Sequence, residues 1–320
     1  MRIVFAGTPE AAVPSLQTLV DSGPARGHEI VGVITREDAP LGRKRVITPS
    51  PVAQFLEQRG LRIPVYKTNR LDDAAVEWVS GLEPDLGVIV AYGGLVREPL
   101  LSLPTHGWIN LHFSALPKWR GAAPVQRALM AGERRLGVSV FRLVEALDAG
   151  ALLQQESHTF ERPVSATSAL QQLATIGAGT LERAIRELEM DPGAGKPQSG
   201  EATYAPKLHR EDGRLDLTRT AAEVLAHWAG VTDEPGAYVE FEGRALKLRE
   251  VAPLHLADTG GAQQPSAADH TPGTVDLVDG KAVLRLSNGA LELVTVQPAG
   301  KAPMDGSAWL RGRGGAAVLS

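Results

Sequence analysis

Five short apolar runs, separated by helix-like stretches, recur through the first 205 residues of this 320-residue chain. They occupy residues 2–6, 30–35, 86–92, 108–112 and 137–143. Uninterrupted runs rich in Val and Ile are typical of strands that are covered on both faces, as in a parallel sheet. The alternation with helical patterns at 51–59, 71–80, 124–131 and 166–189 therefore predicts a doubly wound, mostly parallel α/β sheet of the Rossmann-like kind. Such sheets bind ligands beyond the carboxyl ends of their strands.

The composition changes near residue 191. Residues 191–205 are rich in Gly, Pro and small side chains, which indicates a linker. A helix at 221–229 follows, and then short strand-like runs at 237–241, 245–251, 273–278, 282–286 and 291–296. These runs predict a small, OB-like β-barrel. We therefore expect an α/β domain over residues 1–190, a linker over 191–206 and a β-barrel over 207–320, with a long exposed loop at 257–272.

The composition also excludes several classes of protein. There is no cysteine, which excludes disulfides, a thiol nucleophile and thiolate-bound metal. No H-E-x-x-H motif occurs and the eight His are scattered, so no metal site is predicted. The apolar runs are too short for a signal peptide or a membrane span, which favours a soluble, cytoplasmic protein. Neither part of the chain is basic overall, which argues against a uniformly positive nucleic-acid surface.

Two polar residues, Asn110 and His112, end the fourth apolar run. Side chains two apart on a strand share one face, so both should project at the carboxyl edge of the sheet. An amide can donate to a developing oxyanion, and an imidazole can donate or move a proton. The spacing alone equally allows two polar residues that satisfy backbone groups at a strand end.

Asp148 lies in the loop after the fifth run. A carboxylate near an imidazole would orient the ring and raise its pKa. The pattern alone also fits an exposed turn before Gly150.

Three adjacent cations, Arg43, Lys44 and Arg45, lie in a loop over residues 36–50. They form a flexible positive segment that could contact phosphates, or a solvated surface. The Gly7-Thr8-Pro9 turn after the first run does not complete a G-x-G-x-x-G motif, and is predicted to be structural.

In chain order, the motifs resemble those of the formyl-folate-dependent transferases. They read FAGTPE, VGVITR, GRKR, TPSPV, VIVAYG, INLH, ALP, WRGAAP, LDAG, YAPKL, EPGAY and QPAGK. The INLH to WRGAAP segment is specific for that family, and TPSPV and QPAGK resemble its tRNA-directed member, the methionyl-tRNA formyltransferases. The resemblance covers residues 1 to about 313, with departures such as Phe113, where the family usually has a small residue.

The resemblance implies that 10-formyltetrahydrofolate is the formyl donor and that the α-amine of initiator methionyl-tRNA is the acceptor. It implies that Asn110 and His112 donate to the oxyanion, while Asp148 holds the imidazole and favours its charged form. The residues implied to contact folate are Tyr92, Gly93, Ser114, Ala115, Leu116 and Pro117. Arg43, Lys44 and Arg45 are implied to contact tRNA. We expect a monomer that needs no metal.

Three other hypotheses account for parts of the sequence pattern. A formyltransferase for a small amine, such as a nucleotide sugar or glycinamide ribonucleotide, would carry the same catalytic residues, but would not require the basic segment or the C-terminal barrel. A non-catalytic RNA-binding protein would not require Asn110, His112 and Asp148. A dehydrogenase would be expected to carry G-x-G-x-x-G.

Overall fold

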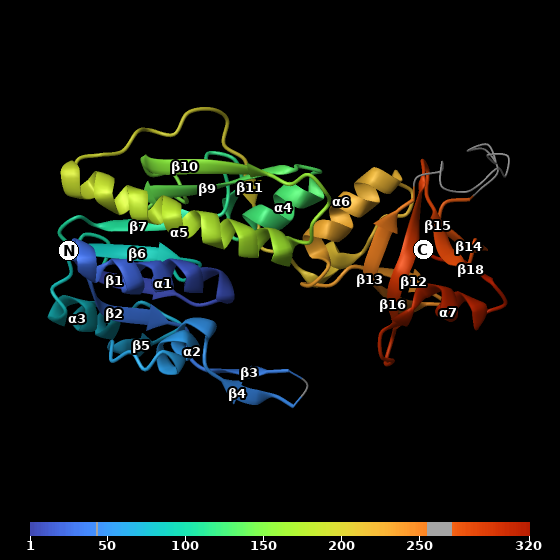
Figure 1. The fold of residues 1–320 in the computed structure, drawn as a ribbon, viewed down its shortest axis with the longest axis horizontal. Coiled ribbons are helices and arrows are strands. Elements are labelled where there is room, and N and C mark those ends of the chain that lie inside the picture. The colour runs from blue at the N-terminus through green and yellow to red at the C-terminus, as the bar shows by residue number, and fades with distance from the viewer. Residues whose placement is uncertain (43, 255–270) are drawn as a thin grey trace. The chain divides into compact units, whose positions relative to one another are not determined.

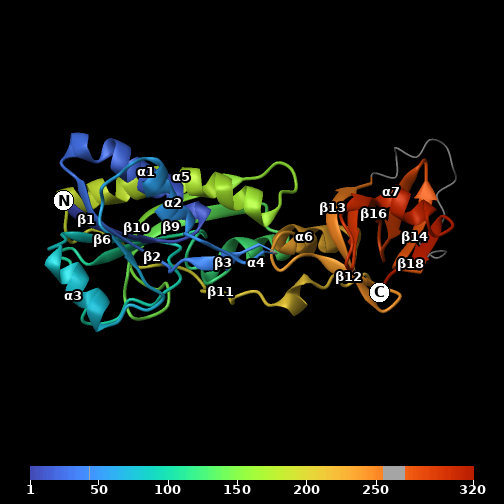
Figure 2. The ribbon, with the colours of Figure 1, turned by 90° about the horizontal axis from the view of Figure 1, so that it is seen from below.

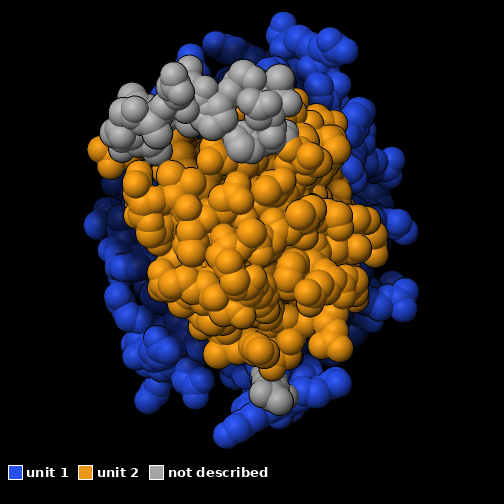
Figure 3. Space-filling model, turned by 90° about the vertical axis from the view of Figure 1, so that its right-hand side faces the viewer, with its two compact units in different colours: residues 1–124, 135–159, 169–206 blue, residues 125–134, 160–168, 207–320 orange. Residues whose placement is uncertain are grey.

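The computed structural model describes residues 1–42, 44–254 and 271–320. The chain divides into two compact units, which Figure 3 shows in different colours. The first unit comprises residues 1–124, 135–159 and 169–206, and the second comprises 125–134, 160–168 and 207–320. Each unit has its own sheet and its own buried apolar core.

The first unit is built on a seven-stranded sheet in the order β10-β9-β7-β6-β1-β2-β5 (Figure 1). Its strands are β1 Arg2–Gly7, β2 Glu29–Thr35, β5 Val65–Lys67, β6 Leu86–Val90, β7 Trp108–His112, β9 Arg135–Arg142 and β10 Leu152–Thr159. The five strands from β7 to β5 are parallel, β9 runs antiparallel to β7, and β10 runs antiparallel to β9. The predicted mostly parallel α/β sheet is confirmed.

Helices cover both faces of this sheet. They are α1 Val13–Ser22, α2 Pro51–Gln58, α3 Asp73–Gly81 and α5 Ala166–Met190. Figure 2 shows α1, α2 and α5 on one side of the sheet and α3 on the other. Leu111 of β7 lies against Gly177 of α5, whereas Trp108 shares a core with Val79 of α3. Because strand side chains alternate, residues 110 and 112 face the same side as Trp108.

The second unit contains an antiparallel sheet in the order β12-β13-β16-β15-β14-β18, with β17 beside β16. The strands are β12 Tyr238–Phe241, β13 Arg244–Pro253, β14 Thr274–Val278, β15 Lys281–Arg285, β16 Ala290–Pro298, β17 Met304–Asp305 and β18 Ala316–Val318. Two backbone hydrogen bonds join Ser320, just after β18, to Glu240 of β12. The sheet is therefore curled, and it encloses a core that includes Trp309, Leu248 and Val296.

Three helices accompany the second sheet: α4 Pro124–Met130, α6 Ala221–Val231 and α7 Gly306–Arg311. The start of α6 is fixed by a capping box, in which the Thr220 hydroxyl accepts from the Glu223 N–H and the Glu223 carboxylate accepts from the Thr220 N–H. Such a cap satisfies donors that a helix start otherwise leaves unpaired.

Some local predictions were wrong. Residues 36–50, predicted as a loop, contain a hairpin of β3 Ala39–Leu41 and β4 Val46–Thr48. β10 was not predicted, because all but one of its residues are exposed or only partly buried and they form no continuous apolar run. In the predicted linker, β11 Tyr204–Ala205 pairs with β8 Arg120–Gly121. Most of the predicted 257–272 loop, residues 257–270, lies outside the described residues.

Among the residues that the structure describes, no helix is both long and apolar enough to cross a membrane.

Candidate active site

The candidate site begins at the carboxyl end of β7, where Asn110 and His112 lie two residues apart. The strand is flanked by β6, which runs parallel to it, and β9, which runs antiparallel. His112 is only 6% exposed, whereas Asn110 is half-buried. An accessible amide and a desolvated imidazole therefore belong to one face of one strand.

The His112 ring has a defined partner on each nitrogen. Nε2 lies 2.9 Å from the Trp119 carbonyl oxygen, and Nδ1 lies 3.8 Å from Asp148 Oδ2. A carbonyl can only accept, so Nε2 carries the hydrogen and the neutral ring presents its lone pair at Nδ1. His112 is therefore arranged to take up a proton at the nitrogen that faces Asp148.

Opposing effects act on the pKa of His112. Burial lowers the pKa of the imidazole below its ordinary value, although Asp148 and the hydrogen bond to Trp119 act in the opposite direction. The lowered pKa favours the neutral form of the ring. Asp148 acts towards the charged form, the direction expected of it, but desolvation of the buried imidazolium is the larger effect.

The loop that contains Asp148 starts beside the first residues of β7, whereas His112 is the last residue of that strand. Because β9 is antiparallel, its last residue, Arg142, pairs with Ile109 near the start of β7. Residues 143–151 then fold back until Asp148 Oδ2 accepts a 2.7 Å hydrogen bond from the Gly121 N–H. Asp148 is 9% exposed and has a left-handed φ of 47°. Such a backbone persists only where its surroundings hold it.

The loop of residues 114–117 has a fixed backbone. The Ser139 hydroxyl donates to the Ser114 carbonyl at 2.7 Å and accepts from the Leu116 N–H at 3.1 Å. The Gln155 amide donates to the Leu116 carbonyl at 2.9 Å. Ala115 of this loop is half-buried and Pro117 is buried. These hydrogen bonds hold the loop backbone in place. The loop follows β7 directly, so it lies next to His112 in the chain.

Tyr92 and Gly93 follow β6. The buried Tyr92 hydroxyl donates to the Thr68 carbonyl at 2.8 Å, and burial raises the pKa of its phenol. Arg36, just after β2, donates to the carbonyls of both residues. The Tyr92 side chain therefore stabilises the loop internally, while Gly93 is exposed.

The basic segment lies on the β3–β4 hairpin. Lys44 and Arg45 are exposed in its turn, whereas Arg43 lies outside the described residues. The hairpin also exposes the apolar side chains Leu41, Val46 and Ile47. It is inserted between β2 and α2, so it begins at the same carboxyl edge of the sheet as the loops above.

Three groups that hold the site were missed in the sequence. They are the Trp119 carbonyl, the Gly121 N–H and the side chain of Gln198, which donates to the carbonyls of Asp148 and Gly150. Backbone groups leave no signal in a sequence. Gln198 lies in a stretch whose Gly and Pro content indicates a linker, and only the WRGAAP motif pointed to the neighbourhood of Trp119 and Gly121.

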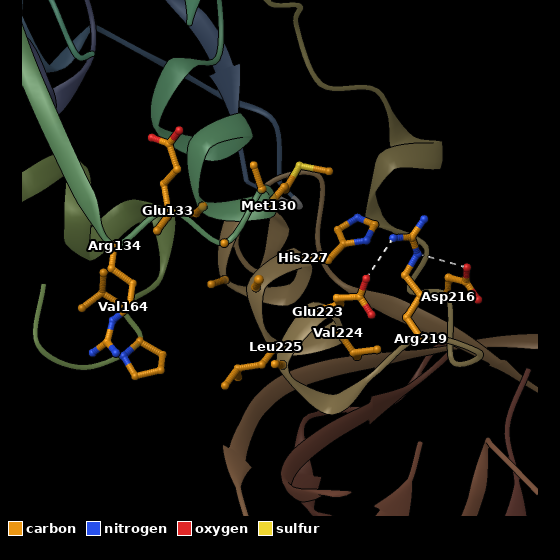
Figure 4. Close-up of a pocket in the computed structure, with 17 residues that line it drawn as sticks. Met130, Glu133, Arg134, Val164, Asp216, Arg219, Glu223, Val224, Leu225 and His227 are labelled. Carbon is orange, nitrogen blue, oxygen red and sulfur yellow. Dashed lines mark hydrogen bonds and ion pairs between the residues drawn. The ribbon is translucent and has the colours of Figure 1, made fainter. Parts of the chain in front are cut away.

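A separate pocket of about 690 Å³ lies in the second unit, lined mainly by α6 and by residues 129–134 at and after the end of α4 (Figure 4). Arg219 is paired with Asp216 and Glu223 at this pocket, and the other lining residues are largely apolar. None of the residues predicted to act in catalysis or binding lines it.

The site's groups are suited to acyl transfer. Asn110 offers an amide donor, His112 a basic nitrogen, and Asp148 a carboxylate that can stabilise the protonated ring. Within the part of the chain that the structure describes, no group of three or more His, Cys, Asp or Glu side chains could hold a metal ion.

Comparison with known proteins identifies the class. Residues 1–185 match the family model described as formyl transferase, and residues 207–314 match the model of the formyl transferase C-terminal domain. The methionyl-tRNA formyltransferase of Leifsonia xyli subsp. xyli is 50% identical over the whole of both chains. That of Clavibacter sepedonicus is 49% identical over 98% of this chain and 97% of the relative. The chain belongs to the methionyl-tRNA formyltransferase family of formyl transferases.

A solved structure shares the fold at low identity. HypX from Aquifex aeolicus, in complex with tetrahydrofolic acid, matches with a TM-score of 0.61 and 19% identity. The match covers 97% of this chain and 47% of HypX, so this chain spans about half of that protein.

Gly150 offers a test of the Asp148 loop. A Cβ at Gly150 would lie 1.7 Å from the Arg142 carbonyl oxygen, so Gly150→Ala must displace the backbone two residues after Asp148. We expect formyl transfer to slow by about tenfold or more, because small displacements of a catalytic group are costly. The rate is measured beside Gly81→Ala, where an added Cβ meets no atom within 4 Å. Equal rates for the two variants would contradict a role for this loop.

Proposed function

We propose that this protein transfers the formyl group of 10-formyltetrahydrofolate to the α-amine of initiator methionyl-tRNA, for the initiation of translation. The observation that carries the proposal is the identity of about half of all positions, over nearly full length, with proteins named methionyl-tRNA formyltransferase. The arrangement of Asn110, His112 and Asp148 supports it, since these groups suit transfer of an acyl group to an amine.

In the proposed reaction, Asn110 stabilises the oxyanion, and His112 and Asp148 handle the proton. The Asn110 amide donates to the formyl oxygen as it becomes an oxyanion, an effect worth about 3–4 kcal/mol. The attacking amine forms the new C–N bond and loses a proton to Nδ1 of His112, which Asp148 then stabilises as an imidazolium. When the tetrahedral intermediate collapses, the bond from carbon to the folate nitrogen breaks and that nitrogen takes the proton. In this scheme the neutral His112 acts as a base, rather than only as an oxyanion donor.

The substrates are assigned to separate surfaces. Folate is assigned to Tyr92, Gly93 and the loop of residues 114–117, which adjoin β6 and β7. Because the Tyr92 side chain is engaged internally, its contact with folate is assigned to the backbone. The tRNA is assigned to Arg43, Lys44 and Arg45.

The domain roles follow from these assignments. We propose that residues 1–190 form the folate-binding catalytic domain, 191–206 the connection and 207–320 a tRNA-contacting barrel of OB-like type. The curled second sheet supports the barrel. We propose a cytoplasmic monomer that works without a metal.

A formylation assay tests the proposal. Purified protein is given 10-formyltetrahydrofolate with initiator Met-tRNA, and in parallel with an amino sugar nucleotide or glycinamide ribonucleotide. Formyl-Met-tRNA as the preferred product is the expected result. Preference for a small amine would favour the alternative formyltransferase instead.

The pH dependence tests the pairing of His112 with Asp148. His112 must be neutral to accept a proton, so kcat/KM should fall on the acid side through a pKa below the ordinary value for His. Asp148 raises the pKa of His112, so Asp148→Asn should lower that pKa and move the acid limb to lower pH. The maximum rate should fall about tenfold or more, because the imidazolium loses its stabilising charge.

The pH profiles of kcat/KM are measured for the wild type and for Asp148→Asn with the same substrate. Because the α-amine of that substrate titrates equally in both, a shift of the acid limb reports on His112. An acid limb that stays in place, or moves to higher pH, would contradict the pairing. Unchanged turnover with weaker folate binding would remove Asp148 from the catalytic set.

A further inference from the structure

Residues 196–205, which we name the strap, connect two parts of the first unit. At one end, Lys196 and Leu152 exchange two backbone hydrogen bonds of 2.8 Å at the start of β10. At the other end, β11 pairs with β8, and the Thr203 hydroxyl accepts from the Trp119 N–H at 2.9 Å. The strap therefore holds the loop that contains both Trp119 and Gly121.

Gln198 is the residue of the strap that reaches the Asp148 loop. Its Nε2 donates to the carbonyl oxygens of Asp148 at 2.7 Å and Gly150 at 2.9 Å. Its Oε1 accepts from the Arg120 guanidinium at 2.6 Å. A primary amide offers two donors and an acceptor at one end of a side chain, and Gln198 uses all three functions. A carboxylate could replace the contact with Arg120, but not the two donors.

These contacts surround the His112–Asp148 pair. Asp148 receives the Gly121 N–H on its carboxylate and the Gln198 amide on its carbonyl. The guanidinium of Arg120, one residue before Gly121, donates to the side-chain oxygen of Gln198. Asp148 and Trp119 both have left-handed backbones, with φ of 47° and 62°. Non-glycine residues keep such a backbone only when neighbouring contacts impose it.

We propose that Gln198 is a positioning residue for formyl transfer, which holds the Asp148 backbone so that the carboxylate stays against Nδ1 of His112. The inference rests on the proposed function, in which His112 accepts the proton of the amine. Gln198 touches neither reacting group directly, and acts through Asp148. Asp148 is the charged group that acts on His112 from the elements packed around it.

The first test is Gln198→Met, which keeps the length of the side chain and removes its hydrogen bonds. We expect kcat to fall about tenfold or more, because a small misplacement of a catalytic group is costly, with KM for both substrates within about twofold. The acid limb of the pH profile should move to lower pH, as for Asp148→Asn, because a displaced carboxylate no longer raises the pKa of His112. Gln171→Ala, at an exposed position of α5, is the matched control and should retain wild-type turnover.

The second test combines the two substitutions. If Gln198 acts through Asp148, then Gln198→Met should change kcat by less than about twofold in an Asp148→Asn background. Unchanged kcat in the single variant, an unmoved acid limb, or an equal loss in both backgrounds would each overturn the inference.

Titration of the His112 ring by NMR gives a readout without substrate. The pKa of His112 should be lower in folded Gln198→Met protein than in wild type, and an equal pKa would overturn the inference. If wild-type protein failed to formylate Met-tRNA, the proposed function would fall, while the NMR comparison would still decide whether Gln198 places Asp148. Failure of the two proposals is therefore distinguishable.

Discussion

Replacing Asn110 or His112 by Ala is expected to lower kcat for formylation of Met-tRNA about a hundredfold or more. Loss of one donor to an oxyanion costs this much in comparable acyl-transfer sites, and loss of a general base costs about 10²–10⁴-fold. The half-buried Asn110 should affect kcat more than KM, since its donor is needed most in the transition state. Steady-state kinetics with each substrate varied in turn give the measurement.

A second variant separates catalysis from folding at His112. His112→Ala leaves the part-buried Trp119 carbonyl without its donor, which costs stability of about 1–3 kcal/mol. His112→Gln keeps an N–H for that carbonyl but provides no base, so it should remain folded and be as inactive as the Ala variant. Asn69→Ala, at an exposed position, is the control for loss of an amide. Full activity of Asn110→Ala or His112→Gln would show that the residue has been assigned wrongly.

Removing two cations from the β3–β4 hairpin should strongly impair use of tRNA. Lys44 and Arg45 are both exposed in the turn. If they contact phosphates, Lys44→Ala with Arg45→Ala should reduce kcat/KM for Met-tRNA about tenfold or more at physiological salt. The salt dependence of tRNA binding should flatten by roughly 0.9 slope units for each lost contact. Binding measured across a series of salt concentrations tests both effects.

Two controls accompany the Lys44→Ala and Arg45→Ala double variant: its affinity for folate, and a separate variant at an exposed arginine. Folate affinity should not change, because the folate loops follow β6 and β7, whereas the hairpin follows β2. Arg62→Ala, at an exposed position ahead of β5, should leave both tRNA binding and its salt slope unaltered. Wild-type efficiency and salt slope in the double variant would show that these two cations are only solvated surface. The assignment of tRNA would then depend on the family alone.

Local patterns in the sequence predicted much of the first sheet. β7 was predicted with its observed bounds, because its short apolar run is buried on both faces and ends at polar residues. The same pattern put Asn110 and His112 on one face, since alternation along a strand needs only local geometry. Phe113 is buried, as expected for a residue that points away from them. Short or partly exposed strands such as β3, β4 and β10 carried too weak a pattern.

The sequence by itself thus determined the parallel sheet, the family motifs and the pair on β7. Only the tertiary structure decided how Asp148 reaches His112, because β9 is antiparallel and its loop returns along β7. Only it showed that burial lowers the pKa of His112 against the opposing effect of Asp148. It also placed Gln198 on the Asp148 carbonyl, 50 residues away in the chain. Hydrogen bonds and desolvation arise between segments that are distant in sequence, so no local pattern of residues records them.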